Sequence, residues 1–176
     1  MGQDDTKHNL LFISKYPEII HEFTDAMKDR DIEIETAING IEAAAKIKKK
    51  NYDVVITGLS LEGYNGEQII TYLNKTAPST VCIIYTTTIS SAQLHFFINE
   101  RNVFRVFLRP VDFRGAFWEA LEEAYEYHAV QVKNEEDTGA RRQEQEKQER
   151  EIEIMDQRMR SQRQARETTN RYMKRL

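Results

Sequence analysis

Hydrophobic residues in the first 130 positions gather in short runs, and the segments between these runs carry them at helical spacing. Three of the runs are apolar almost without interruption, as expected of strands that are covered on both faces. A fourth run alternates isoleucine with glutamate, which is typical of a half-exposed edge strand. Together with an aromatic-rich fifth run, the predicted strands are residues 9–13, 32–36, 53–57, 81–85 and 104–108.

The segments between the strands predict helices. Pro17 suits the first turn of a helix, and Asp112 is expected to cap the last helix. The predicted helices are residues 17–28, 40–50, 67–74, 90–99 and a segment from 113 onward. In the second helix, the residues expected to face inward are Ile41, Ala44, Ala45 and Ile47. Five strands alternating with five helices predict an α/β fold with a doubly wound five-stranded parallel sheet.

The pattern changes after residue 132. Residues 133–176 hold 12 lysines and arginines, 10 acidic residues, six glutamines and a single aromatic residue, Tyr172. Most of these residue types are good helix formers, and Thr138-Gly139 is the one candidate for a break. We therefore divide the chain into a globular domain at 8–132 and a charged helical extension at 133–176.

The extension has a weak heptad pattern. Its apolar residues fit positions a and d of one frame, and they are Ile152, Met155, Met159, Met173 and Leu176. Polar residues share the seam, namely Gln145, Gln148, Gln162, Arg166 and Thr169. Charge is split, with net −5 over 135–156 and net +6 over 157–176. A parallel dimer would set like charges together, whereas an antiparallel dimer, or docking on an acidic partner, would set opposite charges together. A solvated single helix or a partly disordered tail is the remaining possibility.

Composition excludes several classes of protein. The net charge of −4 divides into −6 for residues 1–132 and +2 for the extension, which argues against nucleic acid as a ligand of the domain. The single cysteine excludes a disulfide framework and a cysteine-rich zinc site. No segment is apolar enough to span a membrane, and the polar N-terminus is no secretory signal. We expect a cytoplasmic protein without a metal ion or cofactor.

Chemistry in a doubly wound sheet gathers at the carboxyl ends of the strands. The segments there are SKYP at 14–17, TGLSLEGYNG at 57–66, TTT at 86–88 and LRP at 108–110. With these segments, residues 8 to about 130 resemble the receiver domain of bacterial response regulators. The spacing of DVVITGLSLEGYNG, VCIIYT and FRVFLRPVD matches the third, fourth and fifth strands of that family. The resemblance implies the flavodoxin-like receiver fold.

The resemblance also implies a phosphorylation pocket, and this chain departs from it. The position of the family's phosphoacceptor aspartate is Gly58, and its metal-binding acidic pair is Ser14 and Lys15. The position of the family's lysine is Arg109, whereas Thr86 matches the family outright. A glycine cannot accept a phosphoryl group, and an ammonium repels Mg²⁺. We therefore interpret residues 8–132 as a degenerate receiver, a pseudo-receiver.

In this family, the fourth and fifth helices and the fifth strand commonly contact other proteins. Candidate interface residues on these elements are Phe96, Phe97, Phe104, Val106, at the usual position of a switch aromatic, and Trp118. We expect a non-enzymatic, phosphorylation-independent signalling module that forms a homodimer or binds another signalling protein. Two alternatives remain open. The chain would be a regulatory fragment of a larger signalling enzyme or transcription regulator, or a sensor that binds a small ligand in the altered pocket.

Overall fold

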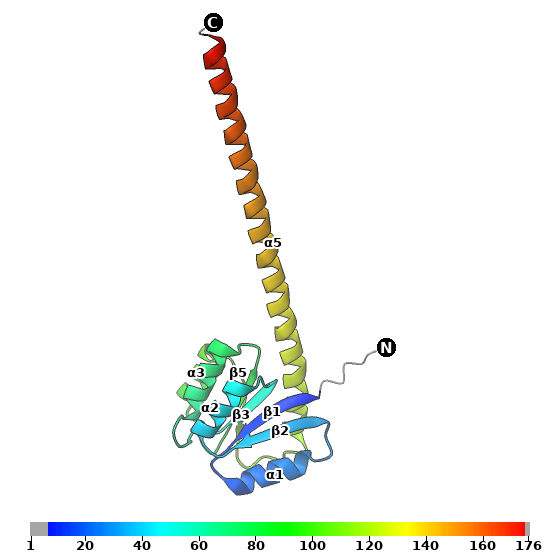
Figure 1. The fold of residues 1–176 in the computed structure, drawn as a ribbon. Helices are drawn as coiled ribbons and strands as arrows, with labels where there is room; N and C mark the ends of the chain where they lie inside the picture. The colour runs from blue at the N-terminus through cyan, green and yellow to red at the C-terminus, as the bar shows by residue number, and fades with distance from the viewer. Residues whose placement is uncertain (1–6, 175–176) are drawn as a thin grey trace. The chain divides into compact units, whose positions relative to one another are not determined.

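The computed structural model describes residues 7–174 and divides the chain into two units, Met1–Val132 and Lys133–Leu176. Unit 1 contains a five-stranded parallel sheet of order β2-β1-β3-β4-β5 (Figure 1). Its strands are β1 His8–Ile13, β2 Ile32–Ala37, β3 Val54–Thr57, β4 Val81–Thr86 and β5 Val103–Leu108. The helices are α1 Pro17–Met27, α2 Gly40–Lys49, α3 Gly66–Thr76, α4 Ser91–Glu100 and α5 Ala116–Met173. The predicted doubly wound sheet is confirmed.

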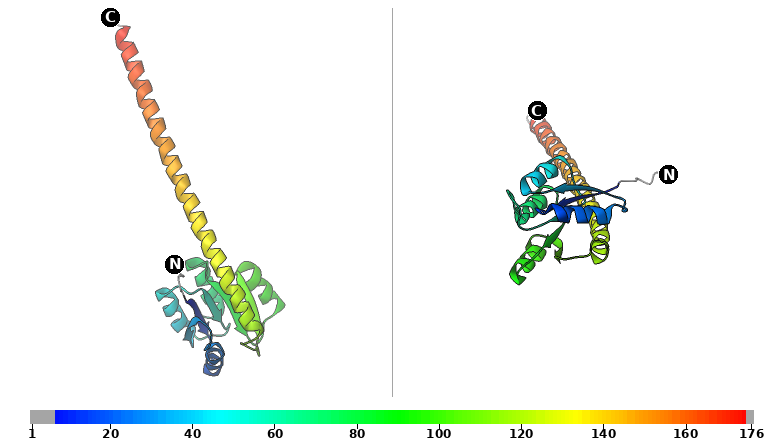
Figure 2. Two further views of the ribbon diagram at one scale, coloured as in Figure 1. Left: turned by 90° about the vertical axis from the view of Figure 1, so that its right-hand side faces the viewer. Right: turned by 90° about the horizontal axis from the view of Figure 1, so that it is seen from below.

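Helices cover both faces of the sheet, as the two views in Figure 2 show. Side chains alternate along each inner strand between the two layers. In β1, Leu10 and Phe12 pack in the layer formed with α1 and α5, whereas Leu11 and Ile13 pack in the layer formed with α2, α3 and α4. These four side chains of β1 are at most 1% exposed. This two-sided burial explains the uninterrupted apolar runs in the sequence.

An aromatic cluster fills the layer beneath α1 and α5. Phe12 stacks on Phe23 of α1 with ring centres 4.2 Å apart. Phe113 meets Phe23 and Phe117 edge to face, at 5.3 and 5.0 Å. Tyr85 at the end of β4 also contacts Phe113, at 5.3 Å. Such packing fixes α1 and α5 against the sheet near its carboxyl edge.

Side-chain caps explain where several helices begin. Pro17 occupies the first turn of α1, as predicted. Asn39 accepts a hydrogen bond from the backbone N–H of Glu42 at 2.8 Å and caps α2. Capping boxes open α3, through Asn65 and Gln68, and α4, through Ser90 and Gln93. These caps satisfy backbone donors that a helix start otherwise leaves without partners.

Two details of the predicted helices are wrong. In α2 the buried stripe is Gly40, Ala43 and Ile47, so that Ile41 and Ala45 face outward. Gly40 must itself face inward because its backbone meets the loop after β3, and this shifts the stripe by one residue. Asp112 does not cap α5, because its carboxylate accepts from the N–H of Arg114 in the turn before the helix.

A polar cluster lies at the amino end of the sheet. The carboxylate of Asp53 accepts from the N–H of Asn9 at 3.2 Å and lies 3.2 Å from Nε2 of His128 on α5. Nδ1 of His128 lies 2.8 Å from the carbonyl oxygen of Ser79, and His8 approaches Asp53 at 3.4 Å. Burial raises the pKa of Asp53, but the hydrogen bonds from His128 and Asn9 outweigh it, so the pKa lies below its ordinary value of 3.8.

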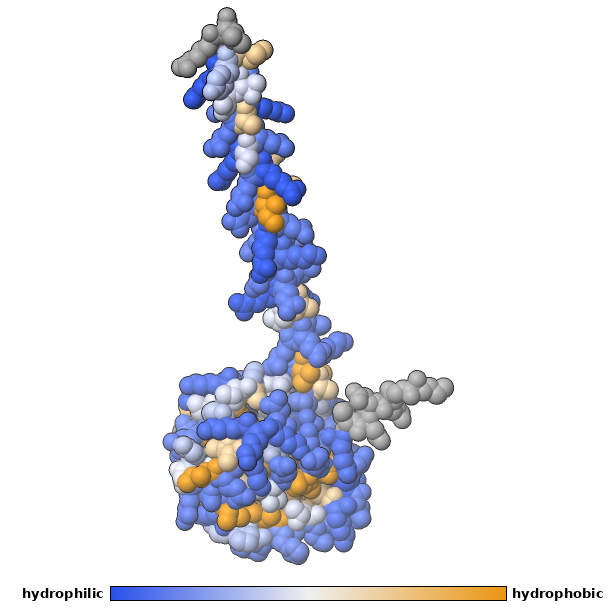
Figure 3. All heavy atoms as spheres, in the orientation of Figure 1, coloured by the Kyte–Doolittle hydropathy of each residue, from blue (hydrophilic) through white to orange (hydrophobic). Residues whose placement is uncertain are grey.

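Unit 2 is helical from Lys133 to Met173, where α5 ends. The helix continues through Thr138-Gly139, the one candidate for a break. Every described side chain from 133 to 174 is exposed, and Figure 3 shows hydrophilic side chains along most of this helix. No helix among the described residues is long and apolar enough to cross a membrane.

We predict that Asp53→Asn lowers the free energy of unfolding by about 1–3 kcal/mol at neutral pH, because a partly buried charged hydrogen-bond acceptor is lost. A carboxylate with a lowered pKa stabilises the fold above its ordinary pKa, and that stability is lost as the pH falls through the lowered value. The variant should therefore lose part of the acid dependence of stability. Urea unfolding at pH 7 and at about pH 3 measures both effects.

Asp31→Asn is the matched control, because Asp31 forms an exposed ion pair with Lys7 at 3.7 Å. Such surface pairs contribute about 1 kcal/mol or less. Equal effects of the two substitutions would show that the cluster around Asp53 does not anchor α5 to the sheet.

Candidate functional site

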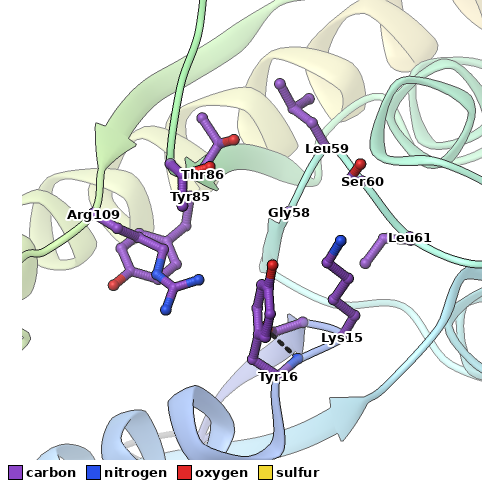
Figure 4. A pocket seen from close by; sticks show the side chains of 11 residues that line it. Lys15, Tyr16, Gly58, Leu59, Ser60, Leu61, Tyr85, Thr86 and Arg109 are labelled. Atoms are coloured by element: carbon purple, nitrogen blue, oxygen red, sulfur yellow. Dashed lines mark hydrogen bonds between the residues drawn. The ribbon is translucent and has the colours of Figure 1, made fainter.

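A cavity of about 150 Å³ opens at the carboxyl edge of the sheet (Figure 4). It lies where β1, β3, β4 and β5 end, as the parallel topology requires. All five predicted pocket residues line it together, and they are Ser14, Lys15, Gly58, Thr86 and Arg109. The other lining residues are Tyr16, Leu59, Ser60, Leu61, Tyr85 and Thr87.

Tyr16 lies between the two cations of the pocket, as Figure 4 shows. The Arg109 guanidinium carbon is 4.7 Å from the centre of the Tyr16 ring, and Lys15 Nζ is 5.2 Å from it. Arg109 also lies 5.9 Å from the ring centre of Tyr85. Aromatic faces attract cations, so these rings hold both charges at the pocket wall. Neither tyrosine was predicted as a pocket residue, although Tyr16 lies within the SKYP segment and Tyr85 directly precedes the TTT segment.

Tyr85 keeps its proton in this setting. Burial raises the pKa of its hydroxyl, and the charge of Arg109 opposes part of that rise.

The backbone of Arg109 is fixed by a main-chain hydrogen bond. Its N–H donates to the carbonyl oxygen of Thr86 at 2.8 Å, which joins the β4 and β5 sides of the pocket. The peptide bond between Arg109 and Pro110 is cis.

Two glycines fix the position of the loop between β3 and α3 through close backbone contacts. The N–H of Gly40 donates to the carbonyl oxygen of Glu62 at 2.9 Å, and a Cβ at Gly40 would lie 1.8 Å from the carbonyl oxygen of Tyr64. The N–H of Gly66 donates to Leu59 at 3.0 Å, and a Cβ there would lie 2.2 Å from the carbonyl oxygen of Gly58. Only glycine permits these close approaches. They fix the loop that forms one wall of the cavity.

Gly58 is different, because nothing crowds it. A Cβ placed there would meet its nearest atom, the carbonyl oxygen of Tyr85, at 3.7 Å, an ordinary contact. Ser14 is buried, and its hydroxyl oxygen accepts from the N–H of Tyr16 at 3.2 Å. The cavity therefore has room for a side chain at the end of β3 where the sequence has none.

The lining residues carry two positive charges and no carboxylate. Neither Lys15 nor Arg109 has a carboxylate within 4.0 Å among the described residues, so no ion pair there neutralises their charges. No group of three or more His, Cys, Asp or Glu side chains suited to a metal ion occurs in residues 7–174. Mg²⁺ requires oxygen ligands of negative charge. The arrangement suits an anion rather than a cation.

The candidate interface residues lie in different places. Phe96 on α4 is half-buried, with Arg101 4.7 Å from its ring centre. Phe104 on β5 is also half-buried and stacks on Tyr127 of α5 at 5.3 Å. Val106 is half-buried against the layer beneath α4. These three residues border the region where α4, β5 and α5 meet.

Two of the predicted interface residues are corrected by the structure. Phe97 is 3% exposed and forms the inward anchor of α4, so it cannot be a surface contact. Trp118 lies 4.2 Å from the guanidinium of Arg30, which follows α1, so its ring faces α1 and not α4. Adjacent residues on a helix point about 100° apart, which explains how Phe117 enters the core while Trp118 does not.

The exposed aliphatic residues of α4 were not among the predicted interface residues. Leu94 and Ile98, four residues apart on one side of the helix, are 41% and 39% exposed. Phe97 is the one residue of α4 that is fully buried. We call Leu94 and Ile98 the α4 face.

The apolar seam residues of unit 2 are also exposed. Ile152, Met155, Met159 and Met173 are each more than half exposed, whereas Leu176 lies outside the described residues. Three of the four lie within residues 152–159 and form a short apolar stripe in a charged helix.

Comparisons with known proteins agree with this geometry. A signal receiver domain of an HD domain-containing protein from Pseudomonas fluorescens is 19% identical, with a TM-score of 0.66, covering 70% of this chain and 98% of that one. An adenylate cyclase from Rhodopirellula baltica is 21% identical, with a TM-score of 0.67, covering 74% and 96%. A CheY-like receiver domain protein from Methanospirillum hungatei is 18% identical, with a TM-score of 0.65, covering 71% and 99%.

No curated protein sequence is matched. At these identities the structural likeness establishes the fold alone. The family follows from the sequence, because the profile of the response regulator receiver domain matches residues 11–115. That span runs from β1 through the turn before α5 and includes every strand end that lines the cavity. The chain therefore belongs to the response regulator receiver domain family.

Proposed function

We propose that this chain is a pseudo-receiver, a non-enzymatic signalling module of the cytoplasm that acts without aspartyl phosphorylation. The observation that carries the proposal is the pocket. Gly58 follows β3 where the family places its phosphoacceptor, and Lys15 contributes an ammonium where the family binds Mg²⁺. A phosphoryl transfer to this site would lack both its nucleophile and the metal that neutralises the phosphoryl oxygens.

The proposed activity is protein interaction. Two large aliphatic side chains exposed on one side of a helix, as Leu94 and Ile98 are on α4, are typical of a contact surface. The α4 face would dock a signalling protein, and unit 2 would join two copies of the chain through its apolar stripe at 152–159. A regulatory role within a longer signalling protein is compatible with this arrangement.

The first test adds acetyl phosphate, or beryllofluoride, together with Mg²⁺. For the natural sequence we expect no gain of a phosphoryl group by mass spectrometry and no shift in melting temperature that depends on Mg²⁺. The variant Ser14→Asp/Lys15→Asp/Gly58→Asp should gain both responses, because Gly58 has room for a side chain and three carboxylates suit Mg²⁺. Phosphorylation of the natural chain would overturn the proposal.

The control for this test is Ser14→Asp/Lys15→Asp/Ser60→Asp. It places the same number of carboxylates on residues that line the cavity but leaves Gly58 unchanged. It should accept no phosphoryl group. A response equal to that of the Gly58→Asp variant would show that the position after β3 has no special role.

The second test measures mass by light scattering after size exclusion, for the full chain and for residues 1–132. The shorter chain retains both core clusters, whose buried residues all precede 126, so it should fold. We expect a dimer for the full chain and a monomer for 1–132. A dimer of residues 1–132 would exclude unit 2 as the assembling element.

Leu94→Glu/Ile98→Glu locates the self-contact if residues 1–132 do form a dimer. Loss of that dimer would assign it to the α4 face. Ile38→Glu is the matched control, because Ile38 is a similarly exposed isoleucine that precedes α2.

A second candidate function is the binding of a small anion, favoured by a pocket lined with Lys15, Arg109 and no carboxylate. Inorganic phosphate should then raise the melting temperature of the natural chain in a saturable manner without Mg²⁺. Arg109→Ala should abolish the rise, whereas Lys28→Ala, which removes an exposed lysine of a surface pair, should retain it. An equal rise in melting temperature in both variants would mean that phosphate stabilises the protein only as a non-specific salt.

A further inference from the structure

The charged positions beside the seam of unit 2 set the orientation of any pairing. In the heptad frame with Ile152 at a and Met155 at d, the flanking e positions include Glu149, Asp156 and Arg163. The flanking g positions include Glu144, Glu151 and Arg158. Helix α5 is continuous through all six residues, and every one of them is exposed. Charges at e and g determine partner choice and orientation in coiled coils.

These side chains are available for a second helix. The ion pairs that the structure describes within unit 2 join Glu146 to Arg142 at 3.6 Å and to Arg150 at 3.9 Å. In the described part of the chain, Glu151, Asp156, Arg158 and Arg163 form no ion pair within 4.0 Å.

A parallel pairing would bring like charges together. In that orientation each g residue faces the e residue of the following heptad on the other helix. The facing residues would be Glu144 with Glu149, Glu151 with Asp156, and Arg158 with Arg163. The two-fold symmetry of the dimer doubles each repulsive pair. Arg166, at a seam position, would also face its own copy.

An antiparallel pairing reverses this pattern. With the helices crossing close to Gln157, e faces e and g faces g, so Asp156 approaches Arg163 and Glu151 approaches Arg158 of the second copy. Met155 then packs against Met159 at the centre, and Arg166 lies opposite Gln148. The acidic segment 135–156 runs beside the basic segment 157–176. The apolar stripe permits either orientation, and the flanking charges select between them.

We propose that two copies of this chain pair through unit 2 as an antiparallel coiled coil that crosses close to Gln157. The occupant of the apolar stripe at 152–159 is therefore the same stripe of a second copy. The inference rests on the self-association proposed above and adds its orientation and register.

Spin labels test the orientation in the full-length chain. Single cysteines replace Gln143, Gln157 or Arg171, which share the outward f position and are spaced fourteen residues apart. The native Cys82 is buried, and burial raises the pKa of its thiol to about 12, so it does not compete for the label. The distance between the two labels of a dimer is measured by double electron–electron resonance.

The antiparallel arrangement gives a short distance at Gln157 and separations of about 40 Å along the axis at Gln143 and Arg171, from about 1.5 Å per residue. Equal short distances at all three positions would mean a parallel pair, which overturns the inference while the proposed self-association stands. No distance at any position would overturn both.

A charge reversal gives an independent readout. Arg158→Glu with Arg163→Glu turns attraction into repulsion in the antiparallel pair, and we expect the dimer to dissociate at roughly tenfold higher protein concentration or more. In a parallel pair the same change merely replaces one repulsion by another. Arg160→Glu with Arg171→Glu, at outward positions b and f, alters the net charge equally and should leave the dimer intact. Equal effects of the two variants would overturn the inference.

Discussion

Burial of the central strands on both faces is the constraint on which the rest of this protein depends. A parallel strand that is covered on both sides needs apolar residues in succession, and each connection must cross the sheet as a helix. Consequently Leu11 and Phe12 of β1, though adjacent in sequence, belong to different layers of the core. The same connectivity brings all the strand ends to one edge. The pocket is therefore positioned by the core, whichever side chains line it.

The pocket is framed by backbone contacts, and its lining carries two cationic side chains and no carboxylate. Gly40 and Gly66 hold the loop after β3 in place through backbone contacts that involve no reactive side chain. Arg109 is fixed in the same way, by a main-chain hydrogen bond to Thr86. Because the scaffold depends on backbone contacts, a change of residue at Gly58 or Lys15 alters the chemistry of the site and leaves its frame intact.

Most of the fold was predictable from sequence because hydrophobic periodicity reports burial directly. The strands, their order along the chain and the segments that meet at the carboxyl edge follow from that pattern and from the topology. The five pocket residues within those segments were singled out by the resemblance to the receiver family. Details that depend on close backbone contacts were not predictable, such as the inward position of Gly40, which turns Ile41 outward. The direction in which a given helical side chain points was not predictable either. Phe97 and Trp118 look alike in sequence as exposed aromatic anchors, yet Phe97 enters the core and Trp118 turns toward α1.

The position of Trp118 has a practical consequence. It is the only tryptophan of the chain, and its indole lies 4.2 Å from the guanidinium of Arg30, at the contact between α5 and the segment after α1. Indole emission depends on the charges and solvent around the ring, so the intrinsic fluorescence of the protein reports on this one contact. A movement of α5 against α1 would change the emission spectrum of Trp118. A protein that docks on α4 and leaves α5 in place would leave that spectrum unchanged.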